Sequence, residues 1–160
     1  MRGARWEEID TAQKLWVVPA DRMKAGRSHR VPLSDAAMQI IGDMAELRHA
    51  DDGGFVFQGM KRGQPLGETA LLRALRRIGR DDLHVHGFRS SFRDWASEQT
   101  SFSHEAVELA LAHLIGDATV RAYARGDLLE KRRQLMQAWA SYCAAPAAEN
   151  VVPMRKQASA

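Results

Sequence analysis

Apolar residues recur every three or four positions along most of this chain, which is the spacing of amphipathic helices. The clearest helix begins at Ser34 and Asp35, two good N-cap residues, and runs to about Arg48. Its apolar face comprises Ala37, Ile40, Ile41, Met44 and Leu47. The same spacing predicts further helices over residues 68–78, 87–98, 104–114, 118–123 and 127–142.

The first 33 residues have a different pattern, with short runs of β-forming residues separated by turns. Residues 14–18 and 30–33 predict two strands, and residues 23–28 contain the glycine and polar residues of a hairpin loop. Pro32 favours an edge position for the second strand, because proline has no N–H to donate. A further short buried strand is predicted at residues 55–57. The chain is therefore expected to be α+β and mainly helical, with a small antiparallel sheet near its N-terminus.

Composition indicates one globular domain. The 160 residues are 45% hydrophobic and 27% charged, and no apolar run approaches the roughly 20 residues that span a bilayer. The first residues do not resemble a secretory signal, so a cytoplasmic protein is expected. Cys143 is the only cysteine, which excludes intrachain disulfides and cysteine-rich zinc sites. Residues 144–160 are rich in small and polar residues and predict a disordered tail, leaving residues 1–143 as the domain.

Arginines are clustered more strongly than the net charge of +3 suggests. Four of them fall three or four positions apart, on one side of the helix predicted over residues 68–78 and just beyond it: Arg73, Arg76, Arg77 and Arg80. A stripe of this kind suits the phosphate backbone of DNA. A solvated basic face explains the same pattern equally well.

His86 and Arg89 lie three positions apart at the start of a predicted helix, so both side chains can face one ligand. The helix N-terminus offers free N–H groups to an anion. Arg89 would hold two phosphate oxygens with its planar guanidinium, and His86 would accept or relay a proton. For an H-x-x-R motif alone, a capping histidine and a surface arginine are the commoner explanation.

Three further residues carry chemistry only in combination. His113 ends an apolar stretch, where a histidine is more often a satisfied core residue than a catalyst. Tyr123 lies between two alanines, and its phenol, with an ordinary pKa near 10, needs cationic neighbours to act as a nucleophile. Lys24 in the hairpin loop would deliver a proton to a leaving oxygen, although a loop lysine is usually only solvated. Tyr142 is better explained by packing.

The order of these motifs is more specific than any one of them. The chain contains, in sequence, R-W-x-x-I-D, W-x-V-P-A-x-R-M-K, H-R-V-P-L-S, H-G-F-R, L-A-H-x-x-G and A-Y-x-R-G-D. This series closely resembles the catalytic domain of tyrosine recombinases of the phage and prophage integrase family, over most of the chain.

The resemblance implies a site-specific DNA recombinase. It matches Tyr123 to the nucleophile that forms a 3′-phosphotyrosine, and Arg89 to the second arginine of the site. His86 matches the histidine before that arginine, His113 the histidine that contacts the phosphate, and Lys24 the lysine that protonates the 5′ oxygen. No metal or other cofactor is implied. The implied partners are double-stranded DNA and further integrase subunits, docked through the helix at residues 127–142.

One part of the family pattern has no counterpart here. The first catalytic arginine of the family lies in an R-T-x-E stretch that would precede Met1, and Arg2 and Arg5 are in the wrong register to match it. We therefore expect a truncated catalytic domain with little or no recombinase activity alone, since losing one charged donor costs on the order of 10²–10³ in rate. A non-catalytic DNA-binding or assembly remnant is the main alternative. A metal-dependent nuclease is a weaker one, because His84 and His86 are accompanied by no carboxylate cluster.

Overall fold

The N-terminal part of the chain folds into a three-stranded antiparallel sheet in this computed structural model, which describes residues 2–49, 53–113 and 126–146. Strand β1 (Ile9–Asp10) pairs with β2 (Leu15–Val18), which pairs with β3 (His29–Pro32). Two short 3-10 helices, η1 (Trp6–Glu8) and η2 (Ala20–Arg22), flank these strands. The predicted hairpin is confirmed, and Pro32 lies in an edge strand as expected.

The predicted strand at residues 55–57 is wrong. Only an isolated bridge joins Phe55 to Arg5, although Val56 is 2% exposed and its N–H donates to the carbonyl of Ala4 at 2.9 Å. The partner segment turns into η1 directly after this point, so no ladder can continue. Val56 is buried, as predicted, but a short apolar run is not sufficient to make a strand.

The remaining regular elements of the described chain are helices, as predicted. They are α1 (Asp35–Glu46), α2 (Ala70–Arg77), α3 (Gly87–Gln99), α4 (His104–Ala110) and α6 (Leu129–Ala144). The Ser34 hydroxyl caps α1 by accepting from the N–H of Ala37 at 3.3 Å. The predicted helix at 118–123 and the predicted tail beyond residue 146 lie outside the described residues. The α+β, mainly helical architecture is confirmed.

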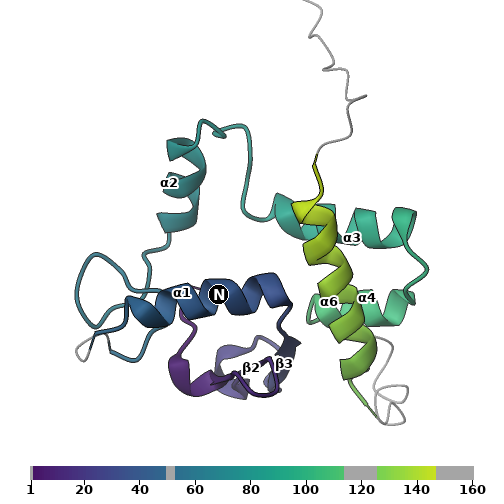
Figure 1. The fold of residues 1–160 in the computed structure, drawn as a ribbon, viewed down its shortest axis with the longest axis horizontal. Helices are drawn as coiled ribbons and strands as arrows, with labels where there is room; N and C mark the ends of the chain where they lie inside the picture. The colour runs from purple at the N-terminus through teal and green to yellow at the C-terminus, as the bar shows by residue number, and fades with distance from the viewer. Residues whose placement is uncertain (1, 50–52, 114–125, 147–160) are drawn as a thin grey trace, which may run out of the picture.

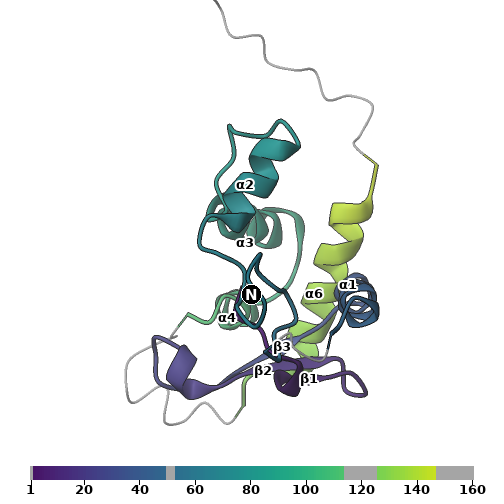
Figure 2. The same ribbon diagram turned by 90° about the vertical axis from the view of Figure 1, so that its left-hand side faces the viewer.

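The hydrophobic core lies where α3, α4 and α6 meet. Its buried members are Phe92, Trp95, Ala96, Val107, Leu111 and Leu135. Trp139 of α6 packs edge-on against Phe92, with ring centroids 5.5 Å apart. Helix α6 also contacts α1 and β3, so it joins the helical core to the sheet (Figure 1). The two views place the sheet at one end of the molecule and α2 at the other (Figure 2).

Helix α1 buries less of its own apolar face than its sequence pattern predicts. Ile41 is buried, but Ile40 and Leu47 are 53% and 62% exposed. These two side chains share the predicted apolar face, yet only part of that face meets the neighbouring elements. None of the helices in the described ranges is long and apolar enough to cross a bilayer.

Candidate active site

Arg89 and His113 meet at the junction of α3 and α4. Nη2 of Arg89 lies 2.7 Å from Nε2 of His113, and the same Nη2 donates a hydrogen bond to the carbonyl oxygen of Leu111. Phe92, one turn after Arg89, anchors this part of α3 in the core. The packing of two helices therefore brings together two residues that the sequence proposed for one site.

The other ring nitrogen of His113 faces a carboxylate that the sequence interpretation missed. Nδ1 of His113 lies 2.6 Å from Oε2 of Glu108, a residue that is only 8% exposed. Arg93 of α3 donates to the other oxygen, Oε1, at 2.8 Å, and His104 approaches it to 3.7 Å. Burial alone would raise the pKa of Glu108, but the hydrogen bonds from His113 and Arg93 outweigh it and lower that pKa. Glu108 is therefore held as a carboxylate.

A tight turn at the end of α4 directs His113 back toward Glu108. Ala112 has φ of 55°, in the left-handed region that favours glycine. The N–H of His113 donates to the carbonyl of Glu108 at 2.9 Å, and the N–H of Ala112 to that of Leu109 at 3.0 Å. These two bonds form a Schellman turn, so the helix predicted to reach residue 114 ends at Ala110 instead.

Some N–H donors of the Arg89 guanidinium are available to bind a ligand. Among the described residues, no acceptor is found for its Nε or Nη1, while Nη2 is engaged by Leu111 and His113. An arginine fixed through one nitrogen and open at the others can bind phosphate oxygens in a defined orientation.

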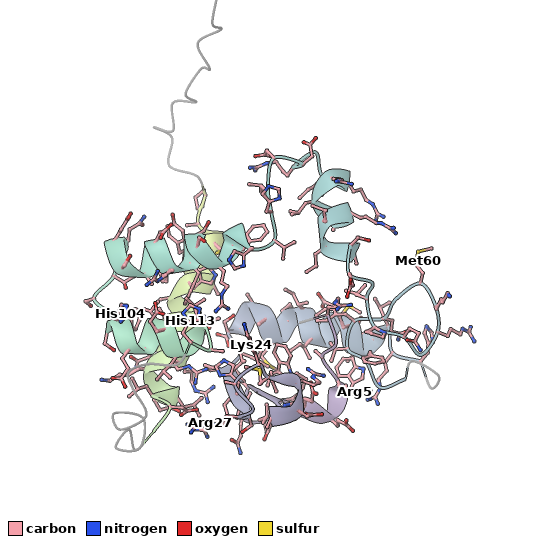
Figure 3. The ribbon with its side chains drawn as sticks, turned by 180° about the vertical axis from the view of Figure 1, so that it is seen from behind. Arg5, Lys24, Arg27, Met60, His104 and His113 are labelled. Atoms are coloured by element: carbon pink, nitrogen blue, oxygen red, sulfur yellow. The ribbon has the colours of Figure 1, made fainter. Side chains whose placement is uncertain are left out.

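Within the described part of the chain, the side chains of His86 and Lys24 make no hydrogen bond to Arg89 or His113. His86 directly precedes α3, where its carbonyl accepts from the N–H of Arg89 at 3.0 Å, but its side chain is exposed and makes no capping bond. Lys24 is exposed on the loop between β2 and β3. Figure 3 shows it on the hairpin, with His113 at the end of α4. Tyr123, the proposed nucleophile, lies outside the described residues.

A second charged cluster ties the sheet to the start of α6. Arg30 of β3 donates from Nε and Nη2 to the two carboxylate oxygens of Asp127, at 2.9 and 2.6 Å. Arg132 of α6 is buried, with 1% of its side chain exposed, and its Nη1 reaches the same carboxylate at 3.4 Å. Its Nη2 donates to the carbonyl of Arg30. The hydrogen bonds from Arg30 are the largest cause of the lowered pKa of Asp127.

His29 of β3 lies between the two clusters. Nη2 of Arg132 is 3.5 Å from its Nε2. Burial lowers the pKa of His29 most strongly, followed by the positive charge of Arg132, and the charge of Arg89 acts in the same direction. His29 is therefore disposed to stay neutral beside two arginines.

The predicted stripe of four arginines on one helix is wrong for Arg80. Arg73, Arg76 and Arg77 are exposed on α2, but the helix ends at Arg77 and Gly79 takes φ of 73°. The N–H of Arg80 then folds back to the carbonyl of Leu75 at 2.9 Å. Its guanidinium pairs with Asp82 at 2.9 and 3.0 Å. The exposed basic surface of α2 thus consists of three arginines.

Sequence reasoning missed Glu108, Asp127, Arg132 and His29. The sequence contains one indication of Glu108, because it is the only charged residue in the apolar stretch 106–112. A carboxylate that is buried with such a stretch needs a hydrogen-bonding partner. Arg30 and Asp127 are 97 positions apart, and no local pattern links them. Within the described ranges, no three His, Cys, Asp or Glu side chains gather as a metal site requires, so the nuclease alternative gains no support there.

Comparisons with known proteins agree with the motif series. The pattern described as the phage integrase family matches residues 1–130. The chain is 39% identical over 151 residues to the prophage integrase IntA of Escherichia coli (strain K12), covering 93% of this chain and 36% of that protein. It is 34% identical over 141 residues to the prophage integrase IntZ of the same strain, covering 88% and 34% of the two chains. It is 30% identical over 144 residues to the integrase of Shigella phage Sf6, covering 89% and 37%.

The chain thus spans between 34% and 37% of the length of these relatives. No solved structure matches it significantly. The resemblance recognised from the motifs is confirmed by a family match that covers most of the sequence, and this chain belongs to the phage integrase family.

Proposed function

We propose that this chain carries the catalytic chemistry of site-specific DNA recombination, in which DNA strands are cut and rejoined through a 3′-phosphotyrosine at Tyr123. The observation that carries the proposal is the Arg89–His113 pair, 2.7 Å apart and backed by Glu108. Such a pair supplies a fixed positive charge where a phosphodiester would gain charge during attack. Family membership supports the same conclusion.

The cleavage step transfers one phosphoryl group and needs no external energy source. The Tyr123 oxygen attacks phosphorus and forms a P–O bond, while the bond from phosphorus to the 5′ oxygen breaks. His86 takes the phenolic proton, and Lys24 gives a proton to the departing 5′ oxygen. Arg89, whose guanidinium is positioned by His113, holds the non-bridging oxygens. A 5′-hydroxyl from a partner strand reverses these steps and rejoins the DNA.

The partners proposed are double-stranded DNA, held in part by the exposed arginines of α2, and further integrase subunits. Helix α6, which packs here on α4, α1 and β3 of its own chain, is the proposed docking element between subunits. The proposed compartment is the cytoplasm, where a prophage meets its target DNA.

A non-catalytic DNA-binding module is the second candidate. It is favoured by the exposure of His86 and Lys24, which make no hydrogen bond to Arg89 or His113 among the described residues. In that case Arg73, Arg76 and Arg77 would hold phosphates without any chemistry.

Covalent trapping separates the two functions. The chain is incubated with a pool of nicked duplexes whose sequences around the nick are randomised, so that a cut strand is lost and the adduct cannot reverse. Mass spectrometry of the digested protein is expected to find a 3′-nucleotide on Tyr123 in a small fraction of the protein after long incubation, in keeping with the low activity expected of this chain alone. The chain has only one other tyrosine, Tyr142, which packs against Trp139 with ring centroids 5.5 Å apart.

Tyr142 therefore gives a matched control. Tyr142→Phe should keep the adduct, and Tyr123→Phe should abolish it while DNA affinity is retained. DNA binding by the unsubstituted chain with no adduct at any concentration would overturn the proposal in favour of the binding module. An adduct that survives Tyr123→Phe would refute the assignment of the nucleophile.

A further inference from the structure

We propose that Glu108 is a positioning residue for the phosphate-binding arginine: its carboxylate holds His113 in the Nδ1-protonated form, and the free Nε2 then orients the guanidinium of Arg89. The proposal rests on the proposed function, because it concerns the same site. Glu108 lies outside the motifs that carry the family resemblance, and its carboxylate acts through His113.

The hydrogen-bonding capacity of arginine decides the protonation of His113. A guanidinium has five N–H donors and no acceptor, so the 2.7 Å contact with Arg89 requires a lone pair on Nε2. The proton of the neutral ring must then lie on Nδ1, where the Glu108 carboxylate accepts it at 2.6 Å. Both contacts are satisfied by one tautomer and by no other neutral form.

Glu108 is itself fixed on three sides. Its Oε1 accepts from Nε of Arg93 at 2.8 Å, and His104 lies 3.7 Å from the same oxygen. The neighbouring Ala106 and Val107 are buried in the core, at 0% and 4% exposure. A carboxylate this well enclosed moves little, so it can hold the imidazole ring in one orientation.

The backbone supports the same arrangement. The Schellman turn at Ala112 joins the N–H of His113 to the carbonyl of Glu108 at 2.9 Å. His113 is thus tied to Glu108 by both main chain and side chain. The exposed side of Arg89 then carries the donors that would meet phosphate, and their direction depends on His113 and on the Leu111 carbonyl.

Nitrogen-15 NMR of the imidazole rings in the full chain tests the proposal without DNA. The unsubstituted protein should show His113 as the Nδ1–H tautomer at pH 8. Glu108→Gln keeps an oxygen acceptor and should keep this tautomer, whereas Glu108→Leu should give a mixture of both. Glu105→Leu, on the same helix but exposed, serves as the matched control and should leave the His113 signals unchanged.

A second measurement asks whether the positioning matters for the reaction. Glu108→Leu should slow adduct formation on Tyr123 by on the order of 10- to 100-fold, as a misplaced catalytic group does. DNA affinity should change much less than the rate, because the exposed α2 arginines, which Glu108 does not contact, still bind the DNA backbone. Glu108→Gln should recover most of the rate.

The positioning role of Glu108 and the proposed reaction at Tyr123 can be refuted independently by these two measurements. An Nε2–H tautomer in the unsubstituted protein, or a His113 tautomer indifferent to Glu108→Leu, overturns the inference even if Tyr123 forms its adduct. If Glu108→Leu does not fold, the unsubstituted protein and Glu108→Gln still decide the tautomer. If the tautomer follows Glu108 but no adduct ever forms, the positioning stands and the proposed reaction fails.

Discussion

The guanidinium of Arg30 and the carboxylate of Asp127 face each other in a two-bond fork, with N–O distances of 2.9 and 2.6 Å. The fork joins the edge strand β3 to the residue that precedes α6 by two positions. Nη1 of the buried Arg132 also contacts this carboxylate, at 3.4 Å from Oδ2. Asp127 therefore compensates two cations, of which one has almost no access to water.

Replacing Asp127 should destabilise the fold clearly. Asp127→Ala leaves Arg132 buried without its carboxylate, and we expect the free energy of unfolding to fall by about 1–3 kcal/mol. Urea denaturation followed by circular dichroism measures it. As a control, Asp82→Ala removes a second two-bond Arg–Asp pair, between Arg80 and Asp82. In that pair the side chain of Arg80 is 51% exposed and that of Asp82 is 61% exposed. That control should leave the midpoint almost unchanged, and equal losses in both variants would contradict the role given to Arg132.

His29 should make stability depend on pH near neutrality. The pKa of His29 is lowered in the folded state, most strongly by burial and next by the positive charge of Arg132. The unfolded chain therefore binds the proton more readily than the folded chain. Stability from this group is present above the unfolded pKa of about 6.5 and is lost as pH falls through the folded pKa. Asp127 carries the opposing charge near His29 and stays ionised over that range, because its own pKa is lowered.

The check is a comparison of urea midpoints between pH 7.5 and 5.5. The unsubstituted chain should lose stability on acidification, and His29→Gln should show a smaller loss over the same range. Identical pH profiles would show that His29 does not titrate differently in the folded state.

The three exposed arginines of α2 should dominate the salt dependence of DNA binding. Each phosphate contact contributes about 0.9 to the slope of log affinity against log salt concentration. Replacing Arg73, Arg76 and Arg77 together with glutamine should flatten that slope, measured by fluorescence anisotropy with a random-sequence duplex. Arg80→Gln should change it little, because Asp82 already holds that guanidinium. A flattening by Arg80→Gln as large as that by the other three would return Arg80 to the binding surface.

Local sequence patterns predicted the elements well but not their ends. The cap at Ser34 and the spacing of Phe92 and Trp95 follow from chemistry within a few residues of each position, and the structure confirms them. Helix ends depend on single backbone conformations. Gly79 stops α2 before Arg80, and a left-handed Ala112 stops α4 before His113. A pattern of apolar spacing does not contain that information.

The site was predicted in part because some of its residues lie in recognisable motifs. Arg89 and His113 come from two such motifs, and the structure brings them together. Glu108 and Arg132 are charged residues within helices, where the sequence alone favours solvent exposure. Their burial follows from the packing of α4 and α6 around Leu135, which is 0% exposed. Such tertiary effects cannot be read from neighbours in the chain.

The turn that carries His113 can be tested at Ala112, whose φ of 55° is unfavourable for a residue with a side chain. Ala112→Gly removes the Cβ atom and should raise the free energy of unfolding by about 0.5–1 kcal/mol. Ala110→Gly, at the end of α4 with helical geometry, provides the matched control and should lower it by a similar amount. Ala112→Val should be the most destabilising of the three, because a β-branched side chain tolerates the left-handed region poorly. If glycine at position 112 destabilises as much as glycine at 110, the left-handed turn is absent, and the main-chain tie between His113 and Glu108 is absent with it.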